Sequence, residues 1–141
     1  MATFTKYQTG VAALLEAINA GTDAFKVCLT NNAPVVATDT TVTAGTTDLA
    51  TGNGYTAGGN AATIASHTQT AGVYKLVLNS PATWTASVGN IGPFRYALLY
   101  DSTTNNLIGY WDYGSALTLL GANGDTFTVT LDATNGTFQV S

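Results

Sequence analysis

Few side chains in this sequence could carry out chemistry, and their spacing matches no known catalytic pattern. His67 is the only histidine, so Ser-His-Asp catalysis would need this residue as its base. It lies in the polar stretch 66–69, and no nucleophile-elbow motif surrounds it. We therefore interpret His67 as a surface or loop histidine.

Cys28 is the only cysteine, so no intramolecular disulfide can form. It lies within the apolar run Phe25–Leu29, which predicts a buried, unreactive thiol that packs like a small hydrophobic side chain. A reactive thiol would need a nearby base, and the sequence indicates none. Zinc requires several His or Cys ligands, and the chain has one of each.

The eight carboxylates and the glycine-rich stretches also lack a chemical pattern. No EF-hand motif is present, and a β-turn explains Asp132 followed by Asn135-Gly136 better than a calcium loop does. Nothing in the sequence supports catalysis by paired carboxylates across strands. Gly52–Gly54 and Gly58-Gly59 are not followed by the Lys-Ser/Thr of a phosphate loop, so we interpret them as flexible loop glycines. We expect no catalytic residue, metal or cofactor, and hence no enzyme.

Aromatic residues are the remaining candidates for a site. One interpretation places them in a hydrophobic core with one hydrogen-bonded tyrosine. Alternatively, they stack on a sugar or anchor a protein interface. The strand alternation in 109–113 sends Tyr110 and Asp112 to one face and Trp111 and Tyr113 to the other. The residues concerned are Trp84, Tyr96, Tyr100, Tyr110, Trp111 and Tyr113.

Composition favours a protein that assembles with other proteins. A chain of 141 residues has the length of one domain, 1–141, with a folded surface of roughly 6,900 Å². Only 9% of the residues are charged, against about 25% in ordinary proteins, and 26 residues are threonine. Such a neutral, hydroxyl-rich surface loses little charge hydration when another protein covers it.

Charge and hydropathy exclude two classes of partner. The net charge is −4 with three lysines and one arginine, too few cations for a nucleic-acid-binding patch. The apolar stretch Val11–Leu15 is too short to span a membrane and is followed at once by Glu16. No secretory signal is recognisable, so we expect a soluble protein made in a cytoplasm.

One amphipathic helix is expected, near the N-terminus. Val11, Leu14, Leu15 and Ile18 have the spacing of one helix face. Thr5–Gln8 fits a capping box and Gly21 fits the C′ position, so the sequence predicts a helix over about 6–20.

The rest of the chain is typical of strands and turns. We expect strands at 24–30, 73–78, 84–88, 94–100 and 107–113, the fourth of them central because it is apolar on both faces. Residues 102–106 join the last two as a hairpin. Residues 35–60 have little periodicity and much Gly, Thr and Asn, so we predict a long irregular loop that contacts a partner.

The last strands have the clearest pattern. Thr126–Leu131 alternates strictly, which places Phe127, Val129 and Leu131 on one face. Asn135-Gly136 predicts a tight turn, after which Phe138 and Val140 point inward, so we expect a C-terminal hairpin. Many short strands with turn signals predict a mainly β, jelly-roll-like antiparallel β-sandwich with one short N-terminal helix.

The order of these segments resembles a class of small virion proteins of tailed bacteriophages. The matching segments are Phe25–Thr30, Gly54–Gly59, Thr83–Thr85, Arg95–Asp101, Leu107–Gly114 and Gly124–Asp132. The match is most similar to capsid cement, or decoration, proteins. The matching segments cover most of the chain. They are sheet patterns without a chemical signature.

The resemblance implies a structural protein on the capsid exterior that cements joints between subunits of the major capsid protein. Self-association as a dimer would extend its reach across a symmetry axis. We expect the loop 35–60 and the N-terminal segment to contact the capsid, so deleting 42–52 should change capsid binding. A phage tail or fibre component stays open. So does a carbohydrate-binding module with Trp84 or Trp111 exposed on a sheet face.

Overall fold

The computed structural model describes residues 2–141, and for Leu15 it describes the backbone only. Strands make up 42% of the chain and helices 8%, so the predicted mainly β class is confirmed. The sheets are antiparallel, and α1 (Gln8–Glu16) is the one α-helix in the described range. The other elements are β1 (Phe4–Lys6), β2 (Phe25–Thr30), β3 (Asn60–Ala61), β4 (Ile64–Thr70), β5 (Val73–Leu78), β6 (Trp84–Thr85), β7 (Ile91–Asp101), β8 (Leu107–Leu119), the 3-10 helix η1 (Gly121–Asn123), β9 (Thr126–Phe127) and β10 (Phe138–Val140).

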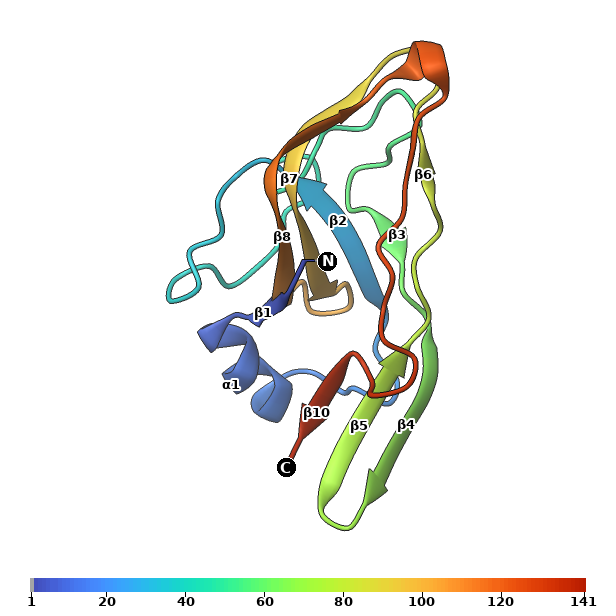
Figure 1. The fold of residues 1–141 in the computed structure, drawn as a ribbon. Coiled ribbons are helices and arrows are strands. Elements are labelled where there is room, and N and C mark those ends of the chain that lie inside the picture. The colour runs from blue at the N-terminus through green and yellow to red at the C-terminus, as the bar shows by residue number, and fades with distance from the viewer. Residues whose placement is uncertain (1) are drawn as a thin grey trace.

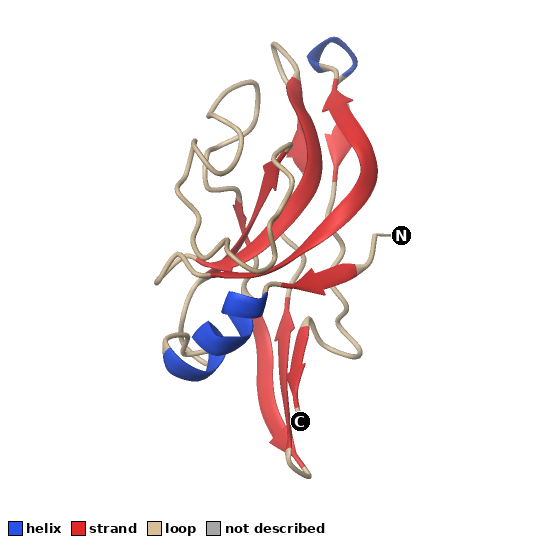
Figure 2. Ribbon diagram, turned by 90° about the vertical axis from the view of Figure 1, so that its left-hand side faces the viewer, coloured by secondary structure: helices blue, strands red, loops and turns tan. Residues whose placement is uncertain are grey.

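The largest sheet has the strand order β1-β8-β7-β2-β3, with β7 at its centre as predicted. The strands β7 and β8 form the predicted hairpin and are longer than expected, and together they curve along the upper part of the molecule (Figures 1 and 2). Arg95 on β7 forms a two-hydrogen-bond ion pair with Asp112 on β8, at 2.7 and 2.8 Å. This ion pair explains the charged Arg95 within the otherwise apolar run 94–100.

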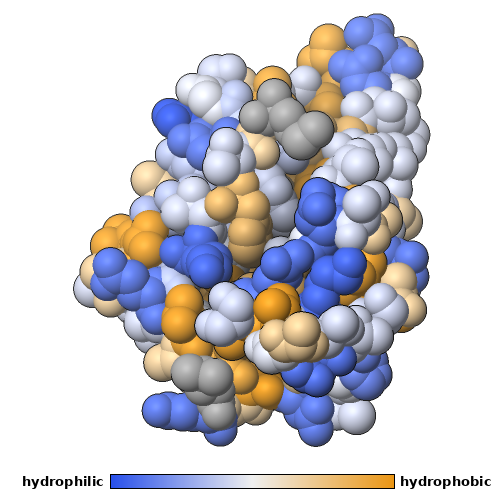
Figure 3. Space-filling model, turned by 60° about the horizontal axis from the view of Figure 1, so that its bottom comes forward, coloured by the Kyte–Doolittle hydropathy of each residue, from blue (hydrophilic) through white to orange (hydrophobic). Residues whose placement is uncertain are grey.

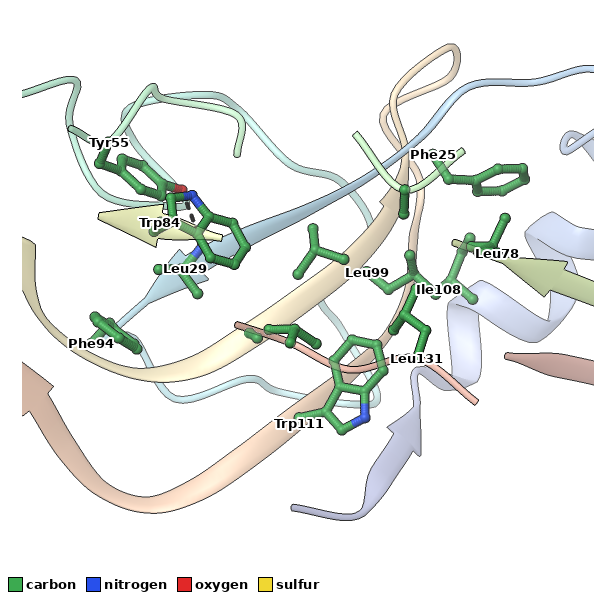
Figure 4. Packing of buried hydrophobic residues seen from close by; sticks show 14 of the residues in the cluster. Phe25, Leu29, Tyr55, Leu78, Trp84, Phe94, Leu99, Ile108, Trp111 and Leu131 are labelled. Carbon is green, nitrogen blue, oxygen red and sulfur yellow. Dashed lines mark hydrogen bonds between the residues drawn. The ribbon is translucent and has the colours of Figure 1, made fainter. Parts of the chain in front are cut away.

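Hydrophobic side chains fill both faces of this sheet. The inner face joins the smaller sheets in the main core, which Figure 4 shows around Trp84, Leu99 and Trp111. A second cluster covers the outer face, and its buried members are Tyr7, Cys28, Val42, Tyr96, Leu98, Tyr100 and Leu107. Because β7 contributes to both clusters, it is apolar on both faces.

The predicted C-terminal hairpin is wrong. β10 pairs with β5, with Phe138 opposite Leu76, and β9 pairs with β6. The burial pattern was nevertheless correct for Val129 and Leu131, which are both buried. The chain between β9 and β10 turns at Asp132, whose carboxylate accepts the backbone N–H groups of residues 134 and 135. It is thereby directed onto the free edge of β5, which leaves Val140 exposed and not inward as predicted.

The helix is shorter at both ends than the predicted 6–20. Residues 4–6 pair with Gly109–Trp111 as β1, so the expected capping box does not form and Tyr7 is the N-cap. At the other end, Ala17 leaves the helical conformation with φ −126°, so Gly21 is not the C′ residue. Of the predicted helix face, Val11 is exposed and Ile18 lies beyond the helix end, whereas the side chain of Leu15 is outside the described residues. Non-local pairing with β8 therefore prevails over the local capping signal.

The strand β4 was not expected from the sequence. Six of its seven residues are exposed, so it shows no alternation of apolar and polar side chains. It forms a hairpin with β5 around Ala71-Gly72, and this hairpin projects from the lower end of the molecule (Figures 1 and 2). The predicted irregular loop is confirmed, because β3 begins only at Asn60 and the two isolated bridges in the described chain are Thr41–Asn106 and Gly52–Tyr55.

Candidate interaction surface

The single histidine and the single cysteine lie in different sheets. His67 is exposed on β4, as the surface interpretation predicted, and its ring lies beside Gly21. Cys28 is fully buried, and burial raises the pKa of its thiol well above the usual range. The predicted inert, packed cysteine is thus confirmed.

The aspartate side chains stabilise turns and loops through hydrogen bonds to the backbone. All seven aspartates accept at least one backbone N–H, so each one fixes a turn or a loop. These aspartates are Asp23, Asp39, Asp48, Asp101, Asp112, Asp125 and Asp132. Among the described residues, no three His, Cys, Asp or Glu side chains are grouped as metal ligands would be. The turn interpretation of Asp132 is confirmed.

Asp101 is a buried carboxylate with a second carboxylate, Asp23, nearby. Asp101 is fully buried at the end of β7 and accepts hydrogen bonds from Thr103 N–H and the Thr104 hydroxyl. Burial raises the pKa of Asp101, hydrogen bonds from Thr104 and Thr103 oppose the rise, and Asp23 adds to it. This arrangement closes the β7–β8 turn against the residues that precede β2.

Two of the loop glycines, Gly54 and Gly59, have a packing role that the sequence did not indicate. Gly59 has φ +75°, and a Cβ there would overlap the backbone oxygen of Val27. Gly54 has φ +100° and lies equally close to the backbone oxygen of Thr85. Both positions need glycine because another backbone passes against them.

The aromatic residues are mainly core residues. Trp84 and Trp111 are both buried, as the core interpretation predicted, so the alternative of an exposed tryptophan platform for a sugar is contradicted. A surface hollow of about 480 Å³ borders Trp111 and Tyr113, but the indole presents no open face there. Of the aromatic residues considered above, Tyr100 is a hydrogen-bonded core tyrosine: its hydroxyl donates to Gly58 O at 2.7 Å, and burial raises its pKa to about 12.

A buried polar cluster anchors the second half of the irregular loop. The Tyr55 hydroxyl donates to Asp48 Oδ2 at 2.5 Å. It also accepts Leu29 N–H at 3.0 Å, the bond that Figure 4 shows. Leu49 N–H donates to Leu29 O, so the loop completes the edge of β2 beyond the short strand β3. Because Asp48 and Val42 are buried, a deletion of 42–52 would remove core residues and does not isolate a contact surface.

The first half of the loop adjoins the helix. Gln8 N–H donates to Val36 O at 3.1 Å, and the Thr9 hydroxyl donates to Asp39 O at 2.6 Å. These bonds hold the loop beside the first turn of α1. We call the exposed uncharged residues of the two segments the helix–loop surface: Gln8, Val11, Ala12, Val35 and Ala37, with the exposed Lys6 and Glu16 at either end of the helix.

Charge is scarce on the outside of the protein as a whole. The accessible surface is 6946 Å², close to the value expected for this mass. Of the chain's charged residues, Lys6, Glu16 and Asp132 are the ones that are largely exposed. No helix within residues 2–141 is long and apolar enough to cross a membrane. No family model, curated protein or solved structure matches the chain.

Proposed function

We propose that this chain is a structural virion protein that binds the exterior of a phage capsid and cements joints between major capsid protein subunits. In this proposal the antiparallel sheets form a jelly-roll-like β-sandwich, and the protein self-associates on the capsid. The observation that carries the proposal is the low charge content of the exterior: 9% of the residues are charged, Lys6, Glu16 and Asp132 are the largely exposed ones, and Asp48 and Asp101 are buried. A large interface on such a surface forms without stripping water from charged groups.

The resemblance in segment order supports the same conclusion and supplies the partner. A cement protein adds contact area across subunit boundaries, so the shell cannot expand without breaking those contacts. Many copies acting together make even a small interface effective. A tail or fibre component would present a similar surface in far fewer copies.

We propose the helix–loop surface as the capsid contact. Val11 and Val35 are its largest apolar side chains and are 42% and 52% exposed. Neither packs into the hydrophobic clusters of the chain itself. Apolar anchors of this kind carry much of the energy in protein interfaces.

Lysine substitutions test this contact. Val11→Lys and Val35→Lys should each weaken binding to capsids stripped of this chain by about tenfold, which corresponds to ~1.4 kcal/mol. Val88→Lys is the matched control, because Val88 is fully exposed and lies in the turn between β6 and β7, away from α1. Equal binding by all three variants in a co-sedimentation titration would remove the helix–loop surface from the proposal.

A further inference from the structure

The strand β4 is an open sheet edge. The order of its sheet is β10-β5-β4, so β4 is hydrogen-bonded to β5 on one side and to no described strand on the other. The hairpin extends below the rest of the molecule, where Figure 3 shows hydrophobic patches broken up by hydrophilic ones. No described strand occupies this edge, and the nearest part of the body is the turn at Gly21, which lies beside the His67 ring.

The turn determines which backbone groups of β4 face outward. Ala71 and Gly72 both have positive φ, at 51° and 84°, as in a two-residue type I′ turn. Thr70 and Val73, which flank it, therefore form a hydrogen-bonded pair, and the pairs alternate from there. It follows that His67 and Gln69 direct their backbone N–H and C=O groups away from β5.

The edge has none of the usual protection against pairing. Natural edge strands are commonly guarded by lysine, proline or inward-pointing charge. Ser66–Thr70 contains no charged residue and no proline, and a bulge interrupts the pairing with β5 only before Ser66. The nearest cation in the register, Lys75 opposite Thr68, is hydrogen-bonded through Nζ to Thr134 O at 2.7 Å.

The segment is complementary to itself. If two copies pair antiparallel about Thr68, His67 of each copy lies opposite Gln69 of the other. These two pairs give four backbone hydrogen bonds. Ser66 then faces Thr70 of the second copy, and Thr68 faces its own counterpart, so hydroxyl groups are paired along one side. No charge lies opposite a like charge, even though each chain carries a net charge of −4.

We propose that β4 pairs with β4 of a second copy about a two-fold axis at Thr68, which joins the two three-stranded sheets into one six-stranded sheet. This inference names the surface for the self-association included in the proposed function. The pairing leaves the helix–loop surface of each copy free, because that surface lies on α1 and the loop after β2. A dimer could then contact two capsid subunits at once.

Disulfide trapping tests the axis. Thr68 and its counterpart form a non-hydrogen-bonded pair with Cα atoms about 4.5 Å apart, which is within the range for a disulfide. Thr68→Cys should therefore form a covalent dimer under mild oxidation. Ser66→Cys is the matched control on the same strand face. It should not cross-link, because Ser66 lies opposite Thr70 of the second copy and is four residues away from the second copy's own residue 66. Cys28 is fully buried, so the wild-type protein should show no cross-link.

Proline substitution tests the backbone bonds. Gln69→Pro removes an outward N–H without removing a bond to β5, whereas Gln69→Ala retains that N–H. In sedimentation velocity over a dilution series, wild-type protein and Gln69→Ala should dimerise and Gln69→Pro should remain monomeric. Circular dichroism of Gln69→Pro should match the wild type.

Three results would overturn the pairing: a monomeric wild type at every concentration, a dimer that persists in Gln69→Pro, or cross-linking of Ser66→Cys as efficient as that of Thr68→Cys. Pairing of β4 with a strand of another protein would appear as a monomer in solution that loses capsid binding in Gln69→Pro. A dimer that fails to bind capsids would contradict the proposed function and leave the β4 pairing standing.

Discussion

At the scale of single residues, the aspartates and tyrosines of this protein hold its loops in place. Asp48 and Tyr55 lie seven residues apart, and together they fix the loop against β2 through the hydroxyl of Tyr55. Burial raises the pKa of this phenol, so it stays protonated and continues to donate to the carboxylate. A chain with few charges thus uses most of them inside its own turns.

Removal of the Tyr55 hydroxyl should destabilise the protein by roughly 2–4 kcal/mol, because Asp48 and Leu29 N–H would both lose a buried partner. The measurement is urea unfolding of Tyr55→Phe. Tyr74→Phe is the control, at a half-buried tyrosine without a hydrogen bond to the described residues, and it should change the free energy of unfolding by less than about 0.5 kcal/mol. Equal effects at the two sites would show that the loop is held by packing and not by this hydroxyl.

The Arg95–Asp112 ion pair should stabilise the fold in a defined pH range. The hydrogen bonds from Arg95, with a further one from Gly114 N–H, lower the pKa of Asp112 to about 2. A carboxyl with a lowered folded-state pKa stabilises the fold above its unfolded pKa, and this contribution is lost as pH falls through the folded value. The difference in unfolding free energy between wild type and Asp112→Asn should be constant above about pH 4 and disappear towards pH 2.

The control for this pH dependence is the double variant with Arg95→Gln. A double-mutant cycle at pH 6 should show coupling between Arg95 and Asp112, and the same cycle near pH 2 should show little. Coupling that is equal at both pH values would contradict an electrostatic origin.

Residue environments could be predicted where a local pattern determines them. The apolar run around Cys28 indicated burial, and the alternation in 126–131 identified Val129 and Leu131 as core residues. The role of Asp48 could not be predicted, because its partners Gly45, Tyr55 and Gly58 come together only when the loop packs on β2. Burial follows from local composition, whereas a polar partner depends on the path of the chain.

At the scale of elements, the strands were predictable and their partners were not. The strand 73–78 was predicted with its observed bounds, and the central position of β7 followed from its two apolar faces. The signals near Thr5 and Asn135 were local, and both predictions that rested on them failed because residues 4–6 pair with β8 and β10 pairs with β5. Local turn chemistry fixes where the chain bends, but not which edge it then joins.

The strand β4 shows the limit of periodicity. Neither face of this strand is buried, so its sequence shows no alternation of apolar and polar residues and predicts only a polar segment around His67. Its pairing comes from the type I′ turn and from β5 beside it. Its outer edge is open for a different reason: β4 is the last strand of its sheet, and no described strand pairs with that side.

At the scale of the whole molecule, two sheets and a small third one enclose a hydrophobic core beneath a nearly uncharged exterior. Two regions of this exterior are suited to partners: the helix–loop surface and the edge of β4. They lie on different elements, so one chain could bind a capsid and a second copy together. In the cement proposal, the helix–loop surface contacts the capsid and the edge of β4 contacts the second copy.

The measurement that tests the proposal most directly is the copy number of this chain in purified phage particles, relative to the major capsid protein. The account predicts a ratio of about one, because a shell-wide lattice of weak contacts needs many copies. A few copies per particle would place the chain in a tail or fibre. Absence from the particles would contradict the account.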